Sequence, residues 1–178
     1  ISSDLKSITW NLKPGILWSD GTPFTSADVL FTYDYCMGEA GCYQEAKFEG
    51  VTNVEALNDL TVKISFADPM PNPYGPFVGS QTPILQKAQF ENCTGTRRQE
   101  CTEENFGPIG TGPFVVTEFK PNDVIQLKAN DNYRDPSKPA FATMVFKGGG
   151  DAAAAGRAVM ETGEYDYGWN LQLAPEVI

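Results

Sequence analysis

The residues best suited to chemistry are four cysteines, which fall as two local pairs in polar, glycine-bearing stretches. Cys36 and Cys42 enclose CMGEAGC, and Cys93 and Cys101 enclose CTGTRRQEC. Neither spacing is the Cys-x2-Cys of zinc ribbons or redox motifs. We predict two small loop-closing disulfides, with the other pairings and four free thiols as alternatives. Bridged pairs persist in an oxidising compartment, which predicts the periplasm or the outer cell surface.

Asp20 and Asp28 are a second candidate, because two neighbouring carboxylates can act as a general acid and base. That role needs a cleft and a raised pKa. A tight turn at Asp20 and a helix cap at Asp28 explain both residues without catalysis. The sequence contains no histidine, the commonest general base and nitrogen ligand. We therefore predict no catalytic site, no metal site and no cofactor.

The charge balance argues against nucleic-acid binding. The formal net charge is -10, whereas nucleic-acid binding needs a basic surface to replace the counterions of the phosphates. No apolar run reaches the roughly 18 residues of a transmembrane helix, and no signal peptide begins at Ile1. Because the chain has no initiating methionine and enters directly into a predicted strand, we expect a processed or truncated piece.

The stretch 18–35, WSDGTPFTSADVLFTYDY, must position both carboxylates. Asp20 and Gly21 predict a tight turn in which glycine takes a positive φ without steric cost. Pro23 fixes the approach to the helix that follows. Trp18, at the end of the preceding strand, is predicted to be a core side chain rather than a ligand platform.

A helix cap is predicted directly after this turn. The Thr25 hydroxyl would accept from the Asp28 N–H, while the Asp28 carboxylate would accept from the Thr25 N–H, as in a capping box. Phe24 and Val29 would bracket the cap as a hydrophobic staple. Trp10 and Phe24 are also predicted to be core.

Hydrophobic periodicity predicts a small antiparallel sheet with one helix in the first part of the chain. Its expected strands are 7–12, 48–55 and 60–66, with a hairpin connection at 57–59. The proline-rich run 67–77 resists helix and central strand alike, so it predicts a rigid surface crossing. A short helix is expected at 83–90.

The run GPIGTG at 107–112 predicts an internal boundary, because it is rich in Gly and Pro and the patterning restarts behind it. The elements expected after it are a hairpin of 114–119 and 124–129 around Lys120-Pro121-Asn122-Asp123, a strand at 141–147, a helix at 152–161 capped by Asp151, and a strand at 164–170. Proline at the second turn position supports the hairpin, and Gly163 is placed to end the helix in a left-handed conformation. The pattern predicts an α+β chain of mixed sheets with flanking helices.

Three segments resemble signatures of the extracytoplasmic solute-binding proteins of family 5, the oligopeptide-, dipeptide- and nickel-binding receptors of bacterial ABC importers. In TWNLKPGILWSDGTPFTSADVLFTYDY the matching residues are Trp10, Leu12, Lys13, Gly15, Trp18, Ser19, Asp20, Gly21, Pro23, Thr25, Ala27, Asp28 and Val29. In GTGPFVVTEFKPNDVIQLKANDNYRD they are Gly110, Thr111, Gly112, Pro113, Phe114, Asn130 and Tyr133. In TGEYD they are Thr162, Gly163, Glu164 and Asp166.

The resemblance implies a partial periplasmic-binding-protein class II fold. Residues 1–106 would form the small subdomain peculiar to this class, and residues 107–178 part of the first lobe. Full members are well over twice this length and enclose the ligand between two lobes. The second lobe, with most side-chain pockets, would be absent from this chain.

The resemblance also implies a non-enzymatic receptor that binds extracytoplasmic peptides and delivers them to the permease subunits of an ABC importer, by hinge closure over the ligand. It would meet the membrane only through the permease or a lipid anchor. Ligand contacts are expected at Trp169 and Asn170, near the hinge, and at Tyr74 and Phe77 in the proline run. A rim role that stabilises the hinge is the alternative for Trp169.

Other functions remain open from the sequence. Within the same fold, the ligand could be a nickel chelate or an oligosaccharide. A small secreted hydrolase that uses carboxylates is disfavoured by the missing histidine. A cytoplasmic sensor domain that shares this fold would not be expected to carry intact disulfides. We expect the chain alone to bind no peptide tightly.

Overall fold

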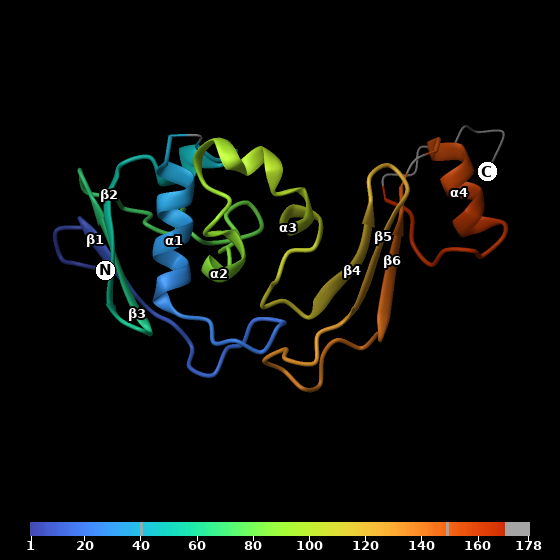
Figure 1. Cartoon of the computed structure of the whole chain (residues 1–178), viewed down its shortest axis with the longest axis horizontal. Helices are drawn as coiled ribbons and strands as arrows, with labels where there is room; N and C mark the ends of the chain where they lie inside the picture. Colours follow the sequence, from blue (N-terminus) through green and yellow to red (C-terminus); the bar gives the residue numbers. More distant parts are fainter. Residues whose placement is uncertain (40, 149, 170–178) are drawn as a thin grey trace.

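The computed structural model describes residues 1–39, 41–148 and 150–169 of the chain. Two three-stranded antiparallel sheets lie apart along the long axis of the molecule, each with helices beside it (Figure 1). The predicted α+β class is confirmed. Both sheets are antiparallel throughout.

The first sheet has the strand order β1–β3–β2, formed by β1 (Ser7–Asn11), β2 (Val51–Asn58) and β3 (Thr61–Phe66). Alternate side chains of β3 are buried, and β2 and β3 lie against helix α1 (Ser26–Met37). Ile8, Val62, Ile64 and Val29 are buried together in this core. The predicted antiparallel sheet with one helix is therefore confirmed.

Element boundaries in this half differ from the prediction in three places. Residues before β2 form the 3₁₀ helix η1 (Glu45–Phe48), so Phe48 reaches the core from a helical turn and not from a strand. The hairpin connection is 59–60, because β2 continues to Asn58. The helix predicted at 83–90 is reduced to α2 (Lys87–Phe90). The segment before α2 is anchored to α1 instead, since the Leu85 N–H donates to Thr32 Oγ1.

The proline-rich run forms neither helix nor strand, and most of residues 67–77 are exposed, which confirms the surface crossing that its composition predicted. Pro73 and Pro76 are buried, and Phe77 packs against the first core. Proline rings are largely apolar and lack a backbone donor, so they can be buried without leaving an N–H unsatisfied. The run therefore covers one side of the first core.

Both predicted disulfides are present, and the structure settles the pairing as Cys36–Cys42 and Cys93–Cys101. Cys36 lies in the last turn of α1. The second pair encloses η2 (Gly95–Glu100) and precedes α3 (Thr102–Phe106). Cys93 and Cys101 form a second buried cluster with Phe90, against which Phe31 and Tyr35 of α1 pack.

The second sheet has the order β4–β5–β6, formed by β4 (Phe114–Lys120), β5 (Val124–Ala129) and β6 (Thr143–Lys147). The predicted turn is confirmed: the Asp123 N–H donates to Lys120 O over 3.1 Å. Asn122 takes a φ of 60° after Pro121, as position three of a type II turn requires.

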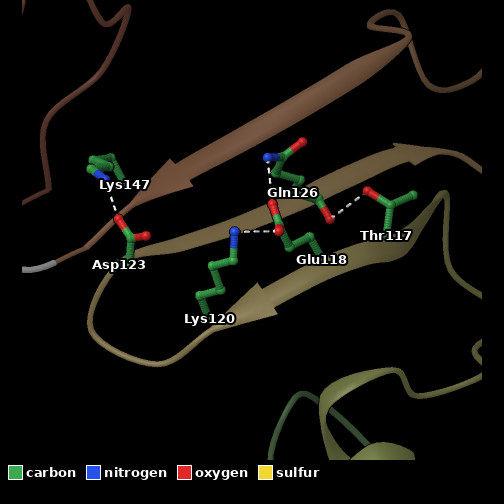
Figure 2. Close-up of polar contacts among 6 residues, drawn as sticks. All are labelled: Thr117, Glu118, Lys120, Asp123, Gln126 and Lys147. Atoms are coloured by element: carbon green, nitrogen blue, oxygen red, sulfur yellow. Dashed lines mark hydrogen bonds and ion pairs between the residues drawn. The ribbon is translucent and has the colours of Figure 1, made fainter.

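Polar side chains tie this sheet together on one side (Figure 2). Thr117 is the extra residue of a bulge in β4, and its hydroxyl donates to Gln126 O over 3.1 Å. Glu118 accepts from Gln126 Nε2 and pairs with Lys120, both over 2.6 Å. Lys147 of β6 pairs with Asp123 in the hairpin turn, and this hydrogen bond lowers the pKa of Asp123. These exposed contacts favour the register but contribute little stability.

Helix α4 (Ala152–Met160) follows the second sheet. The predicted cap is confirmed, since Asp151 Oδ1 accepts from the Ala154 N–H over 2.8 Å, and Gly163 takes a φ of 63°. The strand predicted at 164–170 is wrong over the described residues 164–169. No neighbouring strand pairs with this segment in the described chain, and the Glu164 and Tyr165 N–H groups donate back to Ala158 O. No described helix combines the length and apolarity needed to cross a bilayer.

The second half has no apolar core of its own within the described residues. Every described apolar side chain of β4–β6 is half-buried or exposed, and Val145 and Phe146 are 51% and 53% exposed. Phe141 and Met160 are also exposed. Isolated apolar side chains on a surface are ordinary, but a sheet without a buried apolar layer is not independently stable. This half therefore presents an uncovered apolar surface.

Candidate functional site

Asp28 joins three segments of the first half. The capping box with Thr25 is confirmed, and Asp28 Oδ2 accepts from the Thr25 N–H over 3.0 Å. The same oxygen accepts from Trp18 Nε1 over 3.3 Å, while Oδ1 accepts from the Lys87 N–H over 2.9 Å. Asp28 and Trp18 are both buried. The carboxylate therefore positions the turn, the start of α1 and the start of α2 relative to one another.

Asp20 organises the turn before α1. It accepts from the Thr22 N–H (2.9 Å), the Thr22 hydroxyl (2.7 Å) and Gln86 Nε2 (2.8 Å). Desolvation would raise the pKa of Asp20, but the hydrogen bonds from Thr22 and Gln86 outweigh it and lower the pKa below its usual value. This is opposite to the shift that a general acid needs. The predicted positive φ of Gly21 is observed, at 86°.

The first two signature segments meet at a joint between the two halves. The Ser19 N–H donates to Gly110 O over 2.9 Å, and Asn132 Nδ2 donates to Ser19 O over 3.1 Å. Asn130, only 5% exposed, donates to Gly112 O over 2.8 Å and accepts from the Asn132 N–H over 3.0 Å. These residues hold the loop after α3 and the loop after β5 against the turn before α1.

Three further contacts complete this joint. Gln89 bonds with its side chain to Gly107 O (3.0 Å) and to the Ile109 N–H (2.8 Å). Phe106 of α3 stacks on Phe119 of β4 with 4.7 Å between ring centroids. Sequence reasoning missed Gln89 and Asn132, because their partners lie far along the chain and no local pattern indicates them. The only signal was that Asn132 lies inside the second signature segment.

Replacing Asn130 with alanine is expected to lower the free energy of unfolding by about 1–3 kcal/mol, because Gly112 O and the Asn132 N–H lose a buried partner. Urea unfolding followed by circular dichroism would measure this. The matched control is Asn92→Ala, at an exposed position, where a change within about 0.5 kcal/mol is expected. Equal effects of the two substitutions would contradict the role given to the joint.

The four expected ligand contacts fall at different places. Tyr74 is 48% exposed and meets Trp10 edge-on, with 5.9 Å between ring centroids. Phe77 is half-buried and packs edge-on against Phe48 at 5.1 Å. Trp169 is 82% exposed. Asn170 lies outside the described residues.

These positions do not converge within the described chain. The proline run lies beside the first sheet, whereas the segment after α4 lies beyond the second sheet at the opposite end (Figure 1). Phe77 lines a pocket of about 140 Å³ together with Trp10 and Asn11 of β1. Neither Tyr74 nor Trp169 borders this pocket. As predicted, Trp18 is core, and Trp10 and Phe24 pack against the first core.

Solved structures of other proteins share the fold of this chain. AppA, an oligopeptide-binding protein from Bacillus subtilis solved with a nonapeptide, is 28% identical with a TM-score of 0.78, covering 92% of this chain and 32% of AppA. NikZ from Campylobacter jejuni, solved with Ni(L-His), is 25% identical with a TM-score of 0.78 and the same coverage. The fold is thus part of a class II periplasmic-binding-protein fold.

Sequence comparison identifies the family. The family model for bacterial extracellular solute-binding proteins, family 5, matches residues 1–176. A Brucella ovis protein named as an ABC transporter peptide-binding protein is 28% identical over 170 residues, covering 94% of this chain and 31% of the relative. The chain belongs to the family 5 solute-binding proteins. It spans about a third or less of the length of the relatives it matches.

Proposed function

We propose that the chain is part of the substrate-binding component of an ABC importer that binds extracytoplasmic peptides and delivers them to the permease. The observation that carries this proposal is the similarity to AppA, whose structure holds a nonapeptide, over 92% of this chain. The Brucella ovis relative, named as peptide-binding, supports it over 94% of the chain. The two disulfides favour a periplasmic or outer-surface location.

Residues 1–106 would form the small subdomain and residues 107–178 part of the first lobe. The uncovered apolar surface of the second sheet supports this division, because further chain of the same lobe would cover side chains such as Val145 and Phe146. The joint of Ser19, Asn130 and Asn132 would keep the two parts in one orientation. Lobe closure would then move them as a unit.

The ligand contacts in this proposal are Trp169 and Asn170, with Tyr74 and Phe77 as further candidates. The exposure of Trp169 supports its role, because an indole face that meets no core is available to a ligand. Phe77 is a weaker candidate than Tyr74, since it already packs on Phe48. Main-chain hydrogen bonds and loose side-chain pockets would hold an extended peptide with little sequence preference.

A nickel chelate is the second candidate ligand. NikZ, solved with Ni(L-His), has the same TM-score as AppA. This sequence has no histidine, so a nickel ion would have to arrive with ligands of its own. Peptide and chelate are therefore tested together.

Isothermal titration calorimetry with a mixed di- to pentapeptide library and with Ni(L-His) tests the function. The longer protein that contains this chain is expected to bind peptides with micromolar affinity and to give no heat with Ni(L-His). The chain alone is expected to bind neither, because the surface that would enclose the ligand is incomplete. No peptide binding by the longer protein, or binding of the chelate only, would contradict the proposed function. Micromolar peptide binding by the chain alone would contradict only the expectation that the enclosing surface is incomplete.

Trp169→Ala in the longer protein is expected to weaken peptide binding about tenfold, the loss of one aromatic contact. Tyr167→Ala is the matched control, since Tyr167 is a neighbouring exposed aromatic residue with no assigned contact. An equal loss in both variants would remove Trp169 from the proposed site.

A further inference from the structure

A pocket with no assigned role lies between the C-terminal half of α1, the first disulfide loop and residues 80–85. Its volume is about 420 Å³, within the range of roughly 300–1,000 Å³ that small-molecule sites occupy. Phe48, Leu85, Phe90 and the Cys36–Cys42 disulfide supply apolar walls. Of the expected peptide contacts, the three described ones (Tyr74, Phe77 and Trp169) do not border it, and neither does any residue of the joint.

The lining restricts the charge of an occupant. Among the described residues that border the pocket, the polar ones are serine, threonine, glutamine, asparagine and tyrosine, and none is an acidic or basic side chain. A charged ligand would lose its hydration here without gaining an ionic partner, which is strongly unfavourable. The pocket therefore favours an uncharged molecule.

Thr82 supplies a second and independent observation. It borders the pocket and is 5% exposed, and its Oγ1 has no hydrogen-bond partner in the described chain. Buried hydroxyl groups in folded proteins nearly always have a partner. By contrast, Thr32 Oγ1 on the facing side is already used, since it donates to Asp28 O and accepts from the Leu85 N–H. The Thr82 Oγ1 atom is itself buried, so the side chain would have to rotate to bring this hydroxyl to a molecule in the pocket.

We infer that this pocket binds a small, uncharged aromatic molecule that carries one hydrogen-bonding group. The aromatic walls contact its rings, and Thr82 bonds its polar group. The Cys36–Cys42 disulfide forms part of the wall, so the site depends on the oxidised protein. None of the described peptide contacts borders the site, although Phe48 in its wall packs on Phe77, and all the walls named here belong to this chain.

The test is a fluorescence titration of the chain with N-phenyl-1-naphthylamine, a neutral probe with one N–H donor whose emission rises in apolar surroundings. We expect saturable binding to the oxidised chain, displaced by indole. Gln81→Trp, at an exposed position of the pocket lining, is expected to fill the pocket and weaken binding at least about tenfold. Thr82→Val keeps the side-chain shape but removes the hydroxyl, so a loss of about threefold to tenfold is expected.

Two controls separate this site from other apolar surfaces. Val78→Trp, at an exposed residue of the 140 Å³ pocket, is expected to leave the affinity unchanged. Phe146→Ser, on the uncovered face of the second sheet, is expected to do the same. Absence of saturable binding, or loss of binding in Phe146→Ser but not in Gln81→Trp, would overturn the inference. Near-ultraviolet circular dichroism checks that each variant is folded.

Discussion

Replacing Asp28 with alanine is expected to lower the free energy of unfolding by about 3–5 kcal/mol, the largest effect predicted for any single residue here. The substitution leaves three donors without their acceptor: the Thr25 N–H, Trp18 Nε1 and the Lys87 N–H. Because Asp28 and Trp18 are buried, water cannot replace the carboxylate without opening the structure. Urea unfolding followed by tryptophan fluorescence would measure the loss.

Asp34→Ala is the matched control, because Asp34 is an exposed carboxylate on the same helix. Its effect is expected to stay within about 0.5 kcal/mol. Asp28→Asn keeps one carbonyl oxygen as an acceptor. Its loss in the free energy of unfolding should therefore fall between those of Asp28→Ala and Asp34→Ala. If Asp28→Ala came within about 1 kcal/mol of Asp34→Ala, the central role of Asp28 would be wrong.

Replacing both Cys93 and Cys101 with alanine is expected to cost about 2–4 kcal/mol of stability. Removing the bridge frees the unfolded chain and loosens a buried cluster, since Cys93 is 1% exposed and packs with Phe90. It also releases η2, which carries Arg98. The Arg98 guanidinium stacks on the Tyr35 ring at 3.8 Å and donates to Tyr35 O near the end of α1.

The Cys36–Cys42 pair provides the comparison, because it also closes a short loop but Cys42 is only half-buried. Its double alanine variant is expected to lose about 1–2 kcal/mol. Thermal unfolding of both variants, with helix content followed by circular dichroism, would compare their stabilities. A larger loss of stability in the Cys36–Cys42 variant would contradict the stabilising role given to the buried cluster of Phe90, Cys93 and Cys101.

The features that sequence predicted correctly depend on neighbouring residues. The Thr25–Asp28 capping box, the turn at Pro121 and Asn122, and the Asp151 cap each need only three or four consecutive positions. The disulfide pairing was also predicted, because each bridge closes a short loop. Such contacts form wherever the local backbone forms, so residue type and spacing suffice.

The errors arose where a distant partner decided the outcome. The Leu85 N–H donates to Thr32 Oγ1 of α1. The segment before α2 is therefore bonded to α1, and the predicted helix is shortened to α2. The segment 164–169 has strand-like residues but no strand beside it among the described residues, and a strand without a partner leaves its backbone groups unpaired.

The sequence by itself determined the family, the local turns and caps, the two disulfides and the α+β class. Only the tertiary structure decided what the signature residues do. It brings Ser19 to Gly110 and Asn132, and Asp28 to Lys87, so these residues join segments rather than form a cleft. The physical reason is that a buried backbone or side-chain polar group must find a partner, and the partner it finds depends on which distant segments the fold brings together.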